Sequence, residues 1–184
     1  KTPNTNRLGL PNAGVLINEG EAISVNDFYQ TSAIHIYAVG DVIDKLLRLE
    51  TTAGKEGSYA SENALNGTKN SIDYNTVPYA IFTDPQLAGV GLTEGQEMKQ
   101  FDRCLCRTVS FANLPKAIIL GRKEGVIKMV IHPETKVILG VHILAPYASE
   151  LISEAMMLVK NKNTIDDVVD SLPMFPTLSE AIKI

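Results

Sequence analysis

The sequence predicts an α+β fold in two units, of which the larger, C-terminal one contains an antiparallel sheet of about five strands with helices packed on it. From residue 77 to residue 143, short apolar segments alternate with turn-rich ones, as in a sheet of short strands. Residues 148–160 then carry apolar side chains at helical spacing. The polar stretch 68–76 predicts a connection, so we place the boundary between residues 75 and 76.

In the first unit, the apolar residues 23–25 and 34–39 predict two short strands, the second ending at Gly40 and Asp41. Residues 51–65 predict a helix with a face of small side chains. Either Thr51 or Thr52 could cap its start, and Asn66-Gly67 provides the stop.

In the second unit, Glu134-Thr135 behind Pro133 predicts a tight turn that pairs the last two strands. After the helix at 148–160, Thr164 is expected to cap a shorter helix that runs through Val169. The five predicted strands are residues 77–82, 87–91, 104–111, 126–131 and 136–143.

Composition and charge exclude several classes of protein. The 184 residues are 45% apolar and 21% charged, which is typical of a globular protein. The net charge of −4, without a stripe of Lys or Arg, gives no indication of nucleic-acid binding. The apolar run 137–145 is far shorter than the roughly 20 residues of a membrane helix. Residues 1–6 do not resemble a secretory signal, so we expect a cytoplasmic protein.

The cysteines and histidines are interpreted as structural. Two cysteines, Cys104 and Cys106, exclude a disulfide framework and suit a reducing compartment. Their spacing puts both side chains on one face of a strand, but free cysteines are usually small buried apolar groups, so no metal site is expected. We also interpret His35, His132 and His142 as structural residues.

Gly40-Asp41 is the first candidate site, because a carboxylate at the end of a strand can accept hydrogen bonds from ribose-like hydroxyls. Taken alone, such a pair often does no more than end a strand. Five other stretches accompany it in a fixed order along the chain. The six stretches are residues 3–15, 30–42, 49–57, 82–94, 139–143 and 175–180.

These stretches resemble the FAD-dependent, class I pyridine nucleotide–disulfide oxidoreductase family, from the second flavin motif to the C-terminal active-site segment. The resemblance implies that residues 1–75 are the C-terminal part of an FAD-binding domain and residues 76–184 a dimerisation domain. It implies a homodimer that uses FAD and NAD(P)H. Neither a GxGxxG fingerprint nor the family's redox cysteine pair occurs here. We therefore expect both upstream of Lys1, a short tail beyond Ile184, and an inactive isolated chain.

The resemblance also assigns roles to single residues. Asp41 would bind the ribityl chain of the flavin, and Gly40 would allow close approach of the backbone. Leu49, Glu50, Thr51 and Thr52 would lie near the pyrimidine edge of the ring, where a helix N-terminus stabilises the negative charge of reduced flavin. For Thr51, a role as a helix cap is the simpler alternative.

The C-terminal segment departs from part of the family. In the dihydrolipoamide dehydrogenase and glutathione reductase branches, a His oriented by a Glu precedes the Pro and acts as acid and base. Here Phe175 precedes Pro176, so Glu180 has no imidazole to orient, and a structural role for it is as reasonable as a catalytic one. Phe also precedes the Pro in the mercuric reductase branch, which the sequence therefore favours, although that branch usually has Tyr where Thr177 stands.

We accordingly expect an oxidoreductase that passes electrons to a thiolate-bound metal ion, with dihydrolipoamide dehydrogenase, which acts on a small molecule, as the alternative. In a homodimer of this family, Phe175 and Pro176 would approach the partner's flavin. A third possibility, of another class, is a dimerisation module without catalytic function.

Overall fold

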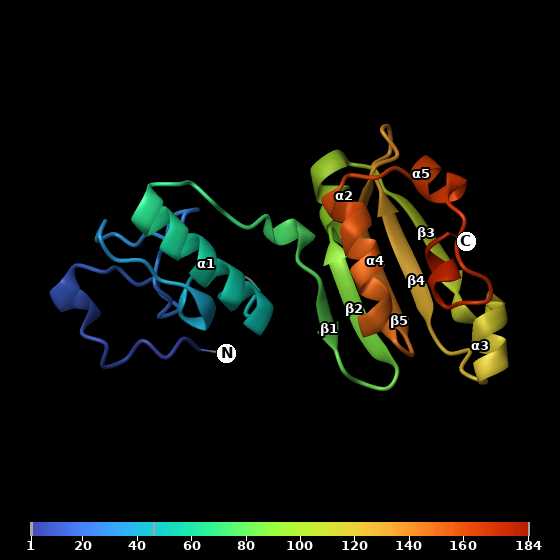
Figure 1. Ribbon diagram of the computed structural model, residues 1–184, viewed down its shortest axis with the longest axis horizontal. Helices are drawn as coiled ribbons and strands as arrows, with labels where there is room; N and C mark the ends of the chain where they lie inside the picture. Colours follow the sequence, from blue (N-terminus) through green and yellow to red (C-terminus); the bar gives the residue numbers. More distant parts are fainter. Residues whose placement is uncertain (1, 46, 184) are drawn as a thin grey trace. The chain divides into compact units, whose positions relative to one another are not determined.

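The computed structural model describes residues 2–45 and 47–183 and divides the chain into two compact units, Lys1–Tyr74 and Asn75–Ile184 (Figure 1). Within the described residues, no helix is long and apolar enough to cross a membrane.

The first unit is built around one helix, α1 (Glu50–Asn66), and loops with short 3-10 turns at Leu10–Ala13 and Gly40–Val42. The two strands predicted for this unit are wrong: its described residues pair only through isolated bridges. At 34–39 the reason is a tight turn, in which Thr31 N–H donates to Ile36 O and Ala38 N–H donates to Tyr29 O. Within this turn, the β-pairing of the described residues consists of one isolated antiparallel bridge, between Gln30 and Tyr37.

Helix α1 begins one residue earlier than predicted, and neither threonine is its N-cap. Leu49 holds that position, while the Thr52 hydroxyl accepts the Leu49 N–H (3.2 Å) and donates to the Leu49 carbonyl (2.7 Å). The predicted stop is confirmed, since Gly67 follows the helix with a left-handed φ of 67°. The buried face of α1 consists of Thr52, Glu56, Ala60 and Asn63.

The second unit confirms the predicted α+β fold with a five-stranded antiparallel sheet in the order β1-β2-β5-β4-β3. The predicted turn at Glu134-Thr135 is also confirmed, because it joins β4 to β5. The strands are β1 (Tyr79–Ile81), β2 (Gln86–Gly91), β3 (Leu105–Ser110), β4 (Val126–Ile131) and β5 (Ile138–Ala145).

Helix α4 (Ala148–Lys160) covers one face of this sheet, as Figure 1 shows. Its buried residues join the inward residues of the strands in the main hydrophobic core. Helix α5 (Ile165–Asp170) follows, and the Thr164 hydroxyl caps it as predicted by accepting the Asp167 N–H at 3.2 Å. The last turn, Ser179–Ile182, returns to the same core through Ala181 and Ile182.

The other face of the sheet is covered at one end by α2 (Glu94–Phe101), which the sequence analysis missed. Its signal is a capping box: the Thr93 hydroxyl accepts the Gln96 N–H, and the Gln96 side chain accepts the Thr93 N–H. A short helix, α3 (Pro115–Leu120), was also missed, although Pro115 at its first position is a typical helix start.

Beyond α2, this second face carries a row of apolar side chains, one from each of four adjacent strands. Residues in register on neighbouring strands share a face, and the register joins Ile81 to Leu87, Leu87 to Leu144, and Leu144 to Val126. Ile81 is 50% exposed, Leu144 41% and Val126 39%, so the row meets solvent in the monomer.

The expectation of free, buried cysteines is wrong, because Cys104 and Cys106 form a disulfide and both are half-buried. The same-face geometry of a C-x-C segment provides the reason. Their Cα atoms are 5.8 Å apart, within the roughly 4.4–6.8 Å that a disulfide spans.

Candidate functional site

In the first unit, the structure brings the predicted Gly40-Asp41 turn against the start of α1. Gly40 has a left-handed φ of 77°, and a Cβ built on it would lie 3.4 Å from the Ala53 Cβ, which is already van der Waals contact. Asp41 lies next to it with its side chain exposed. The turn therefore presents a carboxylate beside the first turns of the helix.

A buried carboxylate, Glu56, holds this arrangement together, and the sequence analysis did not recognise it. Its side chain is 1% exposed. One oxygen accepts the Gly40 N–H at 2.7 Å, and the other accepts the Tyr74 O–H at 2.7 Å. Burial, and secondly the hydrogen bond to Glu56, raises the pKa of Tyr74, so this hydroxyl stays protonated as a donor. The available signal was the i, i+4 spacing of Thr52, Glu56 and Ala60 on one helix face.

The four predicted helix-start residues differ in what they present to solvent. Glu50 and Thr51 are exposed and Leu49 is half-buried. Thr52 is only 3% exposed, and its hydroxyl is hydrogen-bonded to the Leu49 backbone. The Thr52 side chain therefore stabilises the start of the helix from position N3, and a role in flavin binding stays a prediction. A ligand with hydroxyls and a negatively charged edge suits this surface. The surface presents the Glu50 and Thr51 side chains, the N–H groups of the first turn and the Asp41 carboxylate.

In the second unit, Phe175 and Pro176 lie on a loop that is held by hydrogen bonds on its downstream side. Downstream, Glu180 accepts the Thr177 N–H at 3.1 Å, and the Thr177 hydroxyl donates to the Met174 carbonyl at 2.7 Å. Phe175 itself is 67% exposed. Glu180 thus stabilises the loop, and Phe175 projects from it.

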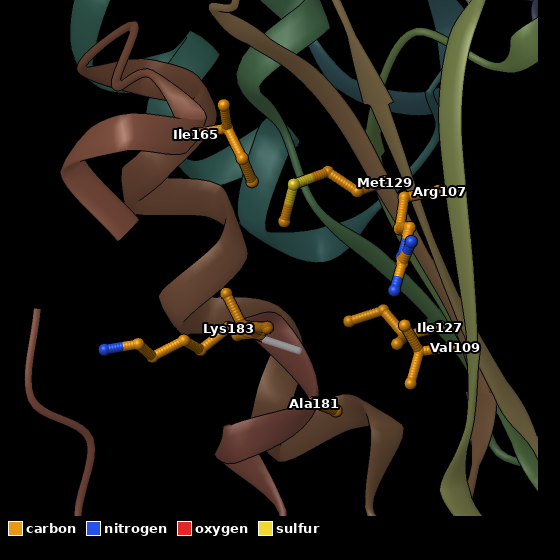
Figure 2. Close-up of a pocket in the computed structure, with 8 residues that line it drawn as sticks. Arg107, Val109, Ile127, Met129, Ile165, Ala181 and Lys183 are labelled. Carbon is orange, nitrogen blue, oxygen red and sulfur yellow. The ribbon is translucent and has the colours of Figure 1, made fainter. Parts of the chain in front are cut away.

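A small pocket lies between the sheet and the C-terminal turn (Figure 2). Most of its lining is apolar, and Lys183 is turned away, with its amino group bonded to the Ser171 carbonyl. Among the residues that the structure describes, the lining includes no carboxylate, thiol or imidazole. The lining residues are Arg107, Val109, Ile127, Met129, Ile165, Ala181, Ile182 and Lys183.

Two of the three histidines have the structural role that was predicted. The His132 Nδ1 accepts the N–H groups of Glu134 (3.2 Å) and Thr135 (3.3 Å) and so closes the hairpin turn. The His142 Nε2 lies 3.0 Å from the Leu92 carbonyl. For His35, which is exposed, the structural role stays a prediction.

Both parts of the chain match profiles of one family. Residues 77–184 match the pyridine nucleotide-disulphide oxidoreductase dimerisation domain, and residues 1–57 match pyridine nucleotide-disulphide oxidoreductase.

Two kinds of enzyme are among the similar proteins. A dihydrolipoyl dehydrogenase of Thermus scotoductus is 40% identical over 99% of this chain and 39% of its own length. A mercuric reductase of Lysinibacillus sphaericus is 36% identical over 100% of this chain and 34% of its own length. The chain thus spans less than half the length of either protein.

Solved structures agree with the fold. LpdA from Mycobacterium tuberculosis matches 99% of this chain and 39% of its own with a TM-score of 0.89 and 30% identity. The HOCl-induced flavoprotein disulfide reductase RclA from Escherichia coli matches 98% of this chain and 42% of its own, with a TM-score of 0.87 and 28% identity.

Proposed function

Since this chain belongs to the pyridine nucleotide-disulphide oxidoreductase family, we propose that it is the C-terminal, dimer-forming part of an FAD- and NAD(P)H-dependent enzyme of the mercuric reductase type. Such an enzyme passes electrons from NAD(P)H through FAD and a redox disulfide to a thiolate-bound metal ion. In this proposal residues 1–75 complete an FAD-binding domain and residues 76–184 form the dimer. The enzyme works in the cytoplasm, and the chain alone is inactive.

The residues of the first unit suit the FAD role assigned to them. Bound FAD supplies the electron-transfer chemistry. Asp41 accepts hydrogen bonds from hydroxyls of the ribityl chain, while Glu56 fixes the Gly40 backbone that positions it. The start of α1, with Glu50 and Thr51 exposed, faces the pyrimidine edge of the ring and favours its negative charge.

The second unit offers apolar surface for a homodimer. The exposed row Ile81, Leu87, Leu144 and Val126 is the kind of surface that soluble proteins cover with a partner. The loop that carries Phe175 adds a second apolar surface, which in this proposal reaches the partner's flavin through Phe175 and Pro176. Glu180 acts there as a positioning residue, through its bond to the Thr177 N–H.

The observation that carries the choice of branch is Phe175. An enzyme that oxidises a dithiol needs a base at this position, and a phenyl ring cannot accept a proton. The histidine nearest to Phe175 along the chain is His142, and its Nε2 lies 3.0 Å from the Leu92 carbonyl, so it is engaged elsewhere. The thiolates that bind such a metal ion have already lost their protons, so reduction of the ion needs no such base.

Two alternatives remain in view. The Thermus scotoductus relative and the segment Thr177-Leu178-Ser179-Glu180 favour a dihydrolipoamide dehydrogenase, which acts on a small molecule. A protein that dimerises but binds no flavin would instead be an interface module without catalytic function.

The branch is tested by grafting this chain in place of the corresponding C-terminal part of the two relatives named above. We expect the mercuric reductase graft to reduce thiolate-bound Hg²⁺. The dihydrolipoyl dehydrogenase graft should oxidise dihydrolipoamide poorly until Phe175→His restores a base, with a gain of about a hundredfold or more. Flavin absorbance and dimer mass serve as the folding controls. If the graft with Phe175 oxidises dihydrolipoamide as fast as its Phe175→His form, the mercuric reductase assignment is wrong.

A further inference from the structure

A disulfide and a buried carboxyl group meet between α2 and the start of β3, far along the chain from the residues assigned to FAD. Cys104 and Cys106 are joined, and the Cys106 Sγ lies 3.6 Å from one oxygen of Glu97. Glu97 is 0% exposed. Its other oxygen, Oε1, has no hydrogen-bond partner among the described residues. A buried carboxyl without full hydrogen bonding is costly, so its retention beside a disulfide calls for a chemical reason.

A disulfide sulfur carries no hydrogen, so the contact between Glu97 and Cys106 is a hydrogen bond only when the Glu97 carboxyl group is protonated and donates its O–H. Burial raises the pKa of Glu97, and the negative charge of Glu94 adds to this, while the Leu105 N–H and His132 act in the opposite direction. Of these groups, Glu94 and His132 are the titratable side chains that act on Glu97.

We propose that Cys104 and Cys106 form a thiol–disulfide exchange site, with Glu97 as its proton donor. The reductant is a small-molecule or protein thiol. Its thiolate attacks the Cys104 Sγ and forms a mixed disulfide, while the bond to Cys106 breaks. The electron pair leaves with the Cys106 sulfur, which takes the proton from Glu97. A second thiolate then attacks the reductant sulfur of the mixed disulfide. The bond to Cys104 breaks, Cys104 leaves as a thiolate, and the two reductant sulfurs form a disulfide.

The geometry favours exchange over metal binding. Glu94, Cys104 and Cys106 do offer one ligand atom each within 4.8 Å of one another. However, the Glu94 carboxylate is already bound to the Lys128 ammonium at 2.6 Å, and the two sulfurs are bonded to each other. The strand that carries Cys106 is an edge strand, and both cysteines are half-buried, so a thiol can reach them.

The test measures how fast dithiothreitol reduces the oxidised chain, by alkylation and mass counting of free thiols, with rates expressed per thiolate. We expect wild type to be reduced fastest at low pH and to slow as pH rises and Glu97 ionises. Glu97→Gln should be reduced about tenfold more slowly near neutral pH, without that pH dependence. Glu94→Gln is the matched control: it removes a carboxylate near the same sulfurs but no proton donor, and should stay within about twofold of wild type.

The wild-type pH profile needs no variant, so it decides the matter even if Glu97→Gln folds poorly. A flat wild-type profile, or equal rates for wild type and Glu97→Gln, overturns the proposal. So does a purified chain with two reduced thiols and one bound Zn²⁺, which would indicate a metal site instead. Because the chain supplies both sulfurs and the acid, none of these outcomes depends on the flavin function.

Discussion

The Glu56 carboxylate accepts the Gly40 N–H at 2.7 Å and thereby fixes the candidate flavin turn to helix α1. The same carboxylate accepts the Tyr74 O–H. We therefore expect Glu56→Ala to remove the acceptor of two half-buried donors and to lower the free energy of unfolding of this unit by about 1–3 kcal/mol. Urea unfolding followed by far-UV circular dichroism measures this.

Glu19→Ala is the control for that prediction, because Glu19 is an exposed carboxylate of the same unit. Its effect should stay within about 0.5 kcal/mol. Equal stability of the two variants would mean that Glu56 does not hold the turn.

Local sequence patterns predicted α1 and the Gly40-Asp41 turn, but neither the bond between them nor the shape of the preceding segment. Glu56 is 16 residues from Gly40, and periodicity says nothing about which buried helix residue meets which loop. The apolar residues 34–39 do have a strand composition. They fold into a turn because the Thr31 N–H bonds to the Ile36 carbonyl, a choice that hydrophobic pattern alone does not decide.

Gly91, at the end of β2, is the glycine at which a side chain would be least tolerated in the sheet. It has a left-handed φ of 78°, and a Cβ would lie 2.1 Å from the Leu139 carbonyl oxygen. We expect Gly91→Ala to destabilise the second unit by about 2–4 kcal/mol. Gly95→Ala, on α2 where a Cβ would meet nothing within 4 Å, should be neutral or stabilising by up to about 1 kcal/mol. Unfolding midpoints that rank the two variants the other way would contradict this account of the strand end.

The exposed apolar row on the second sheet face predicts a dimer that a single charge can break. Leu144 lies in the middle of the row, between Leu87 and Val126, and is 41% exposed. We expect Leu144→Asp to leave the monomer folded, because the side chain already meets solvent, but to weaken dimerisation at least about tenfold, since a carboxylate would be buried in the interface. Analytical ultracentrifugation, with absorbance at 280 and 450 nm, reports mass and bound flavin together.

Leu65→Asp makes the same chemical change at a residue that is 84% exposed near the end of α1, and it should leave the dimer intact. If Leu144→Asp sediments as a dimer, the row is not the interface. A wild-type monomer would also remove the basis for a homodimer in this chain.

The second unit shows where sequence reasoning succeeds and where it stops. The five strands follow from alternating apolar segments and turn residues, which are local signals. The disulfide between Cys104 and Cys106 and the approach of Glu97 depend on how α2 folds back against β3. A charged residue on an amphipathic helix normally faces solvent, so nothing in the local sequence marks Glu97 as buried.

Glu97 also predicts how the stability of the second unit depends on pH. Burial raises the pKa of Glu97 above its ordinary value of 4.5, so the unfolded chain ionises this group at a lower pH than the folded chain does. The folded state is therefore favoured fully below about pH 4.5 and loses stability as pH rises through the raised pKa.

Glu97→Gln cannot ionise. With the disulfide kept oxidised, its free energy of unfolding should therefore decline less than that of wild type between about pH 4.5 and pH 8. The stability difference in favour of Glu97→Gln should grow with pH. Glu94→Gln keeps the titrating group and should show the same decline, displaced slightly to lower pH because the Glu94 charge no longer raises the pKa of Glu97. A constant difference between wild type and Glu97→Gln over this range, in urea unfolding at each pH, would mean that Glu97 does not hold its proton.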